Sequence, residues 1–198
     1  SEFPRDKPCG GGVSIRAASL LPFSIEHVSE RTISNVSFTH RKHQPIIRPY
    51  SKKVTYLTQR IHLDSFLVEH AIQSGVTFRQ REAVKNVERH PNQTIVRTTQ
   101  NVFKSRILVA ADGTNGKTAK LASVDIKHDH GIALEGNITP PGGVPDQWEN
   151  SIGLYFGDIP GGYGWIFPKG DHLNIGLGGW KYLGPTLQTR LKKLIRFY

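Results

Sequence analysis

The sequence predicts a mixed α/β fold (α+β mixed), in which a buried α/β layer is interleaved with an antiparallel β-sheet. Three observations predict it. A helical pattern ends in a glycine and is followed at once by a short apolar strand, over residues 63–78. A continuous apolar run, Ile107–Ala111, is typical of a strand buried on both faces. From Gly131 onward, short apolar strands alternate with glycine and proline turns.

Length and composition indicate an ordinary globular chain. Its 198 residues are 37% hydrophobic and 21% charged, which suffices for one large domain or two small ones. Neither a stretch of about 20 apolar residues nor a signal peptide occurs, so we expect a soluble, cytoplasmic chain. The single cysteine, Cys9, excludes an internal disulfide framework and fits a reducing compartment. The sequence contains no Met, which predicts a piece of a longer protein.

The formal net charge of +10 calls for an anionic partner to be considered. The basic residues are scattered, apart from Arg190, Lys192, Lys193 and Arg196, and no basic-plus-aromatic pattern of a nucleic-acid module occurs. We therefore expect no nucleic-acid partner. A solvated basic face explains the charge, and peripheral contact with a membrane is compatible with it.

The first 58 residues predict one short helix and several short strands. After a glycine turn at 10–12, a helical pattern runs from Ser14 to Leu21 and stops at Pro22. Residues 31–58 alternate between apolar and polar side chains, are rich in β-branched and aromatic residues, and are broken by Pro45 and Pro49.

The middle of the chain begins with the clearest helix, over residues 63–72, which Gly75 is placed to end. A strand at Val76–Phe78 is expected next, and strands at 83–87 and 94–97 predict a β-hairpin. The apolar run Ile107–Ala111 then ends at Asp112-Gly113.

The last third predicts a sheet followed by a helix. Strands are expected at 132–134, 152–156, 165–167 and 173–177. The residues from Pro185 to Tyr198 form an amphipathic helical pattern, with leucines on one side and the basic cluster on the other.

Three places carry residues suited to chemistry. A carboxylate and a flexible backbone at a strand end, Asp112 and Gly113, suit a nucleotide ligand, although an ordinary turn accounts for them as well. The aromatic strand with Tyr163, Trp165 and Phe167 before Pro168 suits an elongated hydrocarbon or a ring system, and also fits a core strand. Cys9 in a mobile glycine loop could approach a ligand, or be inert. The nine histidines show no metal-ligand spacing, so no metal site is expected.

The order of four motifs resembles the geranylgeranyl reductase family, a group of FAD-dependent oxidoreductases within the para-hydroxybenzoate hydroxylase-like flavoproteins. The motifs are, in order along the chain, PRDKPCGGG, QRIHLDSFLVEHAIQSGV, ILVAADG and GGYGWIFPKGDHLNIGLGG. The resemblance covers nearly the whole chain. It implies reduction of isolated C=C bonds of a prenyl (geranylgeranyl-type) substrate by reduced FAD, with NADPH or another donor supplying electrons.

The resemblance also implies roles for particular residues. Cys9, Gly10 and Gly11 match the loop beside the flavin ring and substrate, where the chemistry takes place. Arg60 matches an arginine near the FAD phosphate and adenosine, and Asp112 with Gly113 matches the motif that helps to hold the pyrophosphate. The residues that match the lining of the prenyl cavity are Tyr163, Trp165, Phe167 and Pro168.

Departures from the family pattern concern FAD binding. Gly116 and Lys117 stand where the family has a serine and an arginine-containing helix. A Gly-x-Gly-x-x-Gly turn after an opening strand and the late Gly-Asp motif are both missing. We therefore expect this piece alone to bind FAD weakly or not at all.

The resemblance divides the chain into two interleaved domains. Residues 1–26, 52–80 and 101–124 would belong to the FAD-binding α/β domain, 27–51, 81–100 and 125–184 to an antiparallel-sheet substrate domain, and 185–198 to the start of a C-terminal helix. Two alternatives stay open: a flavin monooxygenase of the para-hydroxybenzoate hydroxylase type, and a lipid-binding domain without flavin.

Overall fold

The computed structural model describes residues 2–41, 43–125 and 129–198, and these form a mixed α/β structure with three sheets. Two compact units can be distinguished by their internal contacts: residues 1–3 with 76–129, and residues 4–75 with 130–198. This division differs from the two interleaved domains expected from the resemblance, and that assignment stays a prediction.

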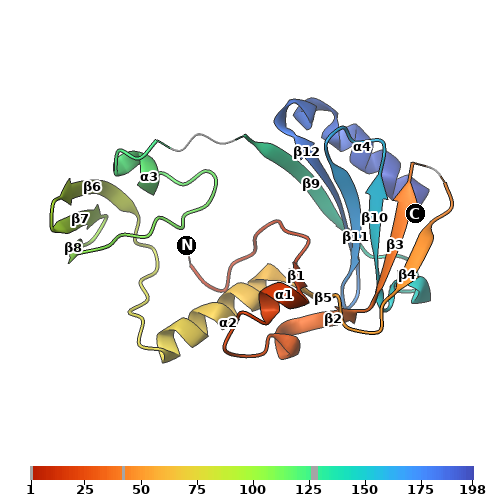
Figure 1. The fold of residues 1–198 in the computed structure, drawn as a ribbon, viewed down its shortest axis with the longest axis horizontal. Helices are drawn as coiled ribbons and strands as arrows, with labels where there is room; N and C mark the ends of the chain where they lie inside the picture. Colours follow the sequence, from red (N-terminus) through yellow and green to blue (C-terminus); the bar gives the residue numbers. More distant parts are fainter. Residues whose placement is uncertain (1, 42, 126–128) are drawn as a thin grey trace. The chain divides into compact units, whose positions relative to one another are not determined.

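The larger unit is built on a six-stranded mixed sheet (Figure 1). Its strand order is β4 (Ile46–Pro49), β3 (Asn35–His40), β10 (Ser151–Phe156), β11 (Tyr163–Pro168), β12 (Leu173–Trp180) and β9 (Gly131–Ile138). Strands β3 and β10 are parallel, and the other neighbouring pairs are antiparallel. The strands expected between residues 131 and 180 are thereby confirmed.

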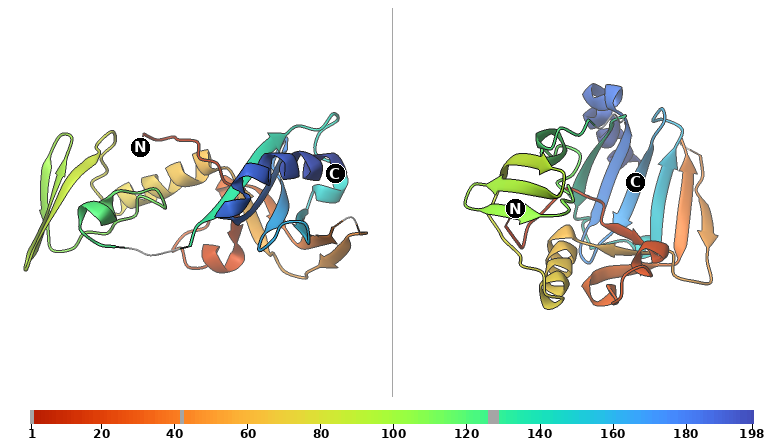
Figure 2. Two further views of the ribbon diagram at one scale, coloured as in Figure 1. Left: turned by 90° about the horizontal axis from the view of Figure 1, so that it is seen from above. Right: turned by 60° about the vertical axis from the view of Figure 1, so that its left-hand side comes forward.

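Helix α4 (Gly184–Phe197) covers one face of this sheet, as Figures 1 and 2 show. Its buried residues Leu187, Leu191 and Leu194 join Ile166 and Leu177 of the sheet in one hydrophobic cluster. Burying leucines every three or four residues requires a helical period, so the amphipathic prediction for the C-terminal segment is confirmed.

A second, three-stranded sheet carries the N-terminal elements of the larger unit. Its order is β1 (Gly12–Ser14), β5 (Thr55–Thr58) and β2 (Ser29–Ile33). Helix α1 is limited to Ile15–Ala18, shorter than expected, and a 3-10 turn, η1, spans Glu26–Val28.

Helix α2 (Arg60–Gln73) packs Leu63, Phe66 and Leu67 against Ile25 and Tyr56. The helix ends at Ser74, and the following Gly75 adopts a φ of +91°, as a glycine terminator does.

The smaller unit contains an antiparallel meander of three strands, shown in light green in the right-hand view of Figure 2. Strands β6 (Val84–His90) and β7 (Gln93–Thr98) form the predicted hairpin, and β8 (Val102–Ser105) extends it. Helix α3 is a single turn, Thr118–Leu121.

Two strand predictions in the smaller unit are wrong. Residues 76–78 and 107–111 form no strand, and Val76, Ile107 and Val109 are 53%, 78% and 78% exposed. A buried strand requires neighbours that bond to both edges and cover both faces. Among the described residues no strand pairs with either segment. In the whole of the described structure, none of the helices could span a membrane.

Candidate functional site

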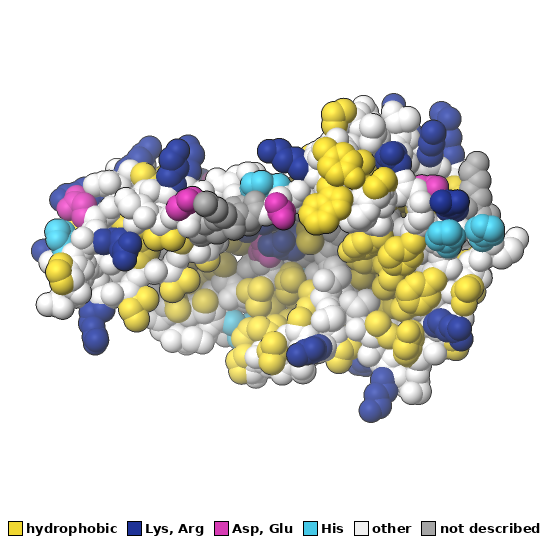
Figure 3. Space-filling view, turned by 45° about the horizontal axis from the view of Figure 1, so that its top comes forward, with side chains coloured by type: hydrophobic (Ala, Val, Ile, Leu, Met, Phe, Trp, Pro, Cys, Tyr) yellow, Lys and Arg dark blue, Asp and Glu magenta, His cyan; other side chains and the backbone are white. Residues whose placement is uncertain are grey.

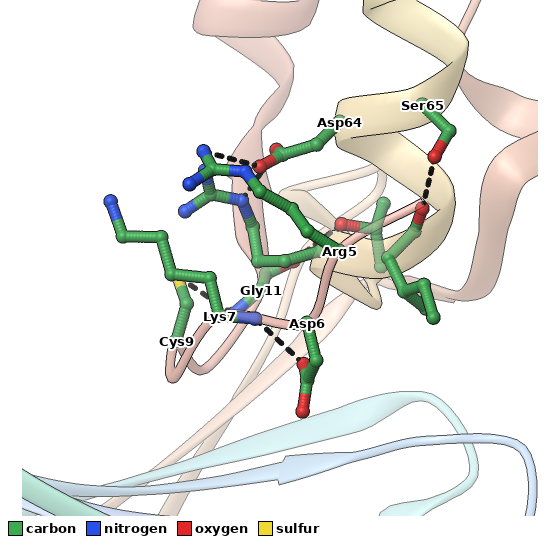
Figure 4. Close-up of polar contacts among 10 residues, drawn as sticks. Arg5, Asp6, Lys7, Cys9, Gly11, Asp64 and Ser65 are labelled. Atoms are coloured by element: carbon green, nitrogen blue, oxygen red, sulfur yellow. Dashed lines mark hydrogen bonds and ion pairs between the residues drawn. The ribbon is translucent and has the colours of Figure 1, made fainter. Parts of the chain in front are cut away.

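The cysteine–glycine loop lies against the aromatic strand β11. An ideal Cβ on Gly10 would lie 2.9 Å from Nε1 of Trp165 and 3.0 Å from the ring of Phe167. Only a glycine allows the backbone to approach the rings so closely. Cys9 is exposed, and its Sγ accepts a 3.4 Å hydrogen bond from the N–H of Gly11 (Figure 4). Two motifs that are more than 150 residues apart in the sequence therefore meet in the larger unit.

Arg60 begins helix α2 and forms a two-pronged ion pair with Asp64 of the same helix. Its Nε and Nη2 lie 2.6 and 2.8 Å from the two carboxylate oxygens of Asp64. Arg5 adds a third bond at 3.1 Å, so two guanidinium groups converge on one buried carboxylate (Figure 4). The hydrogen bond to Asp64 raises the pKa of Arg60, against the opposing effect of burial. Asp64 thus fixes the guanidinium beside the cysteine loop.

A cavity of about 200 Å³ lies between the loop and the large sheet. This volume is below the roughly 300–1,000 Å³ of sites that enclose a whole small molecule. The cavity can therefore take part of a larger ligand. The lining residues that matter here are Cys9, Arg60, Glu135, Lys169, His172 and Asn174. The four residues of the aromatic motif are not among its lining residues.

The aromatic side chains of β11 form a row on the sheet face opposite α4. Tyr163, Trp165 and Phe167 alternate with inward residues such as Ile166, which is 1% exposed. Successive ring centroids are 6.1 and 6.3 Å apart. Tyr163 is 45% exposed, whereas Trp165 is 9% exposed and Pro168 is fully buried. The exposed end of the row is therefore Tyr163.

Trp165 is held in one orientation by its neighbours. Its indole N–H donates to Oδ1 of Asn174 at 2.8 Å, and Nδ2 of Asn174 donates to Oδ1 of Asn137 at 2.9 Å. The ring lies across Gly176, where a Cβ would come within 2.1 Å of it. This burial agrees with Trp165 as a core residue and leaves its contact with substrate a prediction.

Asp112 and Gly113 lie in the smaller unit. Oδ2 of Asp112 accepts hydrogen bonds from the backbone N–H of Lys117 and from the N–H and hydroxyl of Thr118, at 2.8, 2.9 and 2.8 Å. These hydrogen bonds lower the pKa of Asp112, and those from Thr118 contribute most. Gly116 permits the arrangement, because a Cβ there would lie 2.3 Å from the carboxylate.

The turn that contains Asp112 and Gly113 borders a cavity of about 790 Å³. Gly113 adopts a φ of +82°, in the left-handed region that favours glycine. One carboxylate oxygen of Asp112 is committed to the first turn of α3. The role of this turn in holding a pyrophosphate stays a prediction.

A groove of about 880 Å³ runs between α4 and the large sheet. Arg190, Lys193 and Arg196 line it together with apolar residues. Tyr155 donates its hydroxyl hydrogen to Asp158 in this groove, and burial raises the pKa of Tyr155 to about 12. Three of the four residues of the C-terminal basic cluster thus border this groove.

Sequence reasoning missed Lys169, Glu135 and Asn174. Lys169 is 2% exposed and its Nζ donates to the carbonyl oxygens of Gly10 and Thr58. The available signal was a lysine placed directly after an apolar strand, within the motif string GGYGWIFPKGD. Lysines are almost never fully buried, so its position alone did not indicate this role.

Comparison with curated proteins finds named reductases. The chain is 26% identical over 209 residues to the digeranylgeranylglycerophospholipid reductase of Methanococcus vannielii, covering 93% of this chain and 53% of the relative. It is 26% identical over 203 residues to the chloroplastic geranylgeranyl diphosphate reductase of Arabidopsis thaliana, covering 93% of this chain and 43% of the relative. The chain thus spans about half the length of the curated relatives it matches. No family model matches the chain.

Solved structures with a similar fold include a geranylgeranyl bacteriochlorophyll reductase-like protein from Thermoplasma acidophilum. Its TM-score is 0.80 at 22% identity, over 98% of this chain and 53% of the other. The halogenase PltM, solved with phloroglucinol and FAD, has a TM-score of 0.72 at 12% identity, over 100% and 50%. At these identities the likeness shows the fold.

Proposed function

Because the chain is a relative of the geranylgeranyl reductases, we propose that its protein is an FAD-dependent oxidoreductase that reduces isolated C=C bonds of a prenyl substrate. The observation that carries the proposal is the meeting of the Cys9–Gly11 loop with the aromatic row of β11. One side of this junction offers a thiol and close backbone, and the other offers ring faces for a hydrocarbon.

The residues of the larger unit suit one wall of a flavin site. Gly10 and Gly11 let the loop backbone pack directly against Trp165 and Thr58, so the loop forms a fixed edge of the proposed site. Arg60 places a positive charge next to Cys9, in keeping with a phosphate-bearing cofactor. The cavity of about 200 Å³ would take part of such a group.

Bound reduced FAD would supply a hydride to the double bond, and the protein would orient the substrate in a dry pocket. Tyr163 and Phe167 would contact the prenyl chain, while Trp165 and Pro168 support the row from within. Asp112 and Gly113 would lie toward the pyrophosphate. NADPH or another donor would supply the electrons to the flavin.

The test uses the full-length protein, purified and incubated with FAD before desalting. Retained flavin absorbance is expected, followed by a mass gain of about 2 Da per reduced bond when a geranylgeranyl substrate is added to the reduced enzyme. Incorporation of oxygen into an aromatic product would favour a monooxygenase instead. Absence of bound flavin would overturn the proposal in favour of a lipid-binding domain.

A separate variant tests the aromatic row of β11. Tyr163→Ala removes the exposed ring, and KM for the prenyl substrate should rise with little change in fold. The matched control is Tyr50→Ala, since Tyr50 is 50% exposed and lies outside the row. Equal kinetics for the two variants would remove the aromatic row from the substrate site.

Peripheral contact with a membrane is a second part of the proposal, supported by the basic side of α4. Lys192 and Lys193 are exposed, and Figure 3 shows Lys and Arg spread around an area of apolar side chains on the part of the chain at the right. Co-sedimentation with anionic but not neutral vesicles is expected, and the Lys192→Glu/Lys193→Glu variant should lose it. Equal binding to both vesicle types would count against this part.

A further inference from the structure

A buried ammonium group lies beneath the cysteine–glycine loop. Lys169 directly follows β11 and is 2% exposed. Its Nζ donates to the carbonyl oxygen of Gly10 at 2.8 Å and to that of Thr58 at 2.7 Å. Both acceptors are uncharged, so the lysine ties the loop to the end of strand β5 at the cost of burying a charge.

Gly11 is fixed at the same point. It adopts a φ of +69°, and a Cβ there would lie 1.9 Å from the carbonyl oxygen of Thr58 and 2.8 Å from Nζ of Lys169. The carbonyl oxygen of Gly11 accepts bonds from both the N–H and the hydroxyl of Thr58, at 2.8 and 3.2 Å. The loop is therefore held between the end of β5 and the ammonium group.

Three groups attract the charge of Lys169. They are Glu30 on β2, Cys9 on the loop and Glu135 on β9. Glu30 is itself bonded to the backbone N–H of Gly170 at 3.2 Å and to Gln59. These acidic groups oppose the cost of burying the ammonium group.

The cations around Lys169 act in the opposite sense. Arg31 donates through Nε to the carbonyl oxygen of Lys169 at 2.7 Å. Lys7 and Arg60 line the same cavity, together with the side chains of Asp6 and His172. The ammonium group therefore lies near charges of both signs, and it donates its hydrogen bonds to the carbonyl oxygens of Gly10 and Thr58.

We propose that Lys169 is a positioning residue, whose terminal nitrogen holds the Cys9–Gly11 loop in the conformation in which it meets cofactor and substrate. The use of that conformation in catalysis rests on the proposed function, whereas the hold is a property of this chain. Burial lowers the pKa of Lys169 to about 8. Because burial beneath the loop lowers this pKa, loss of the proton favours the closed loop, and the hold strengthens as the pH rises through 8.

The first test measures amide exchange at Thr58, whose N–H is bonded to Gly11. In Lys169→Met we expect the protection of this amide to fall about tenfold, and in Lys169→Arg to be largely retained. The control is Lys181→Met, because Lys181 also directly follows a strand of the sheet, β12, but is exposed. Unchanged protection in folded Lys169→Met would overturn the proposal.

A second measurement covers the case in which Lys169→Met does not fold. The protection factor of Thr58 in the unaltered protein should rise between pH 7 and 9, whereas in Lys169→Arg it should stay level because arginine keeps its charge. Identical pH dependence in the two proteins would contradict the proposal.

The full-length enzyme separates this inference from the proposed function. If both hold, prenyl reduction falls in Lys169→Met and is largely retained in Lys169→Arg. If no variant reduces a prenyl substrate but the exchange results stand, the proposed function fails and the hold survives. If the enzyme is active and Lys169→Met reduces the substrate as fast as the unaltered enzyme, the positioning role fails.

Discussion

The indole N–H of Trp165 donates a 2.8 Å hydrogen bond to Oδ1 of Asn174, and both residues are buried. Asn174→Ala would leave this N–H buried without a partner. We expect the free energy of unfolding to fall by about 2 kcal/mol, measured by urea denaturation. Asn92→Ala is the control, because Asn92 is exposed and lies outside this chain of hydrogen bonds, so its loss should cost under about 0.5 kcal/mol.

A double-mutant cycle sharpens this prediction. Trp165→Phe removes the N–H, so Asn174→Ala should cost less in that background, by about 1 kcal/mol. Additive effects of the two changes would mean that the hydrogen bond contributes nothing measurable.

The buried charge of Lys169 predicts that stability depends on pH. Its pKa is about 8 in the folded protein, against an ordinary value of 10.5 for the unfolded chain. Between these values the unfolded chain binds more protons, so the free energy of unfolding rises with pH. The expected rise between pH 8 and 10 is about 2 kcal/mol.

The comparison with Lys169→Met isolates this effect, since the variant should lack the rise. The window stops at pH 10 because Tyr155, whose pKa is raised to about 12, acts in the opposite sense between 10 and 12. Parallel stability curves for the two proteins from pH 8 to 10 would show that Lys169 does not carry the effect.

Periodicity predicted the helix and strands that pack or pair with other elements of the described structure. Helix α4 and strands β10 to β12 bury most of the residues that the pattern assigned to the core, such as Leu187 and Ile166, whereas Ile132 and Leu134 of β9 are exposed. The run Ile107–Ala111 has equally strong strand character, but strand formation also depends on a neighbour to pair with. A local pattern carries no information about that neighbour.

The sequence singled out some residues of the candidate site but not their arrangement. Gly10 and Trp165 stood out in separate motifs, and only the folded chain places one against the other. The burial of Lys169 was not predicted, because a lysine after a strand is ordinarily solvated. Its burial depends on carbonyl groups of Gly10 and Thr58, which are distant in sequence and which every residue possesses.

The carboxylate shared by two arginines gives a third prediction. Asp64 is buried and bonded to both Arg5 and Arg60. Asp64→Asn should lower the free energy of unfolding by about 2 kcal/mol, below the roughly 3–5 kcal/mol of a fully buried pair, because the guanidinium groups reach water. Glu69→Gln, an exposed change on the same helix, should cost under about 0.5 kcal/mol. Similar losses in both would mean that the convergence on Asp64 adds no stability.

The tight approach of the cysteine–glycine loop gives the last prediction. In Gly11→Ala the new methyl group would lie 1.9 Å from the carbonyl oxygen of Thr58, at a φ of +69° that alanine disfavours. The loop must therefore move, with an expected loss of about 3 kcal/mol in urea denaturation and a loss of protection at Thr58. Gly170→Ala is the matched control, since no atom lies within 4 Å of its added Cβ. A methyl group has room at Gly170 but none at Gly11. A Gly11→Ala protein as stable as Gly170→Ala would therefore mean that the loop does not pack against β5 in solution.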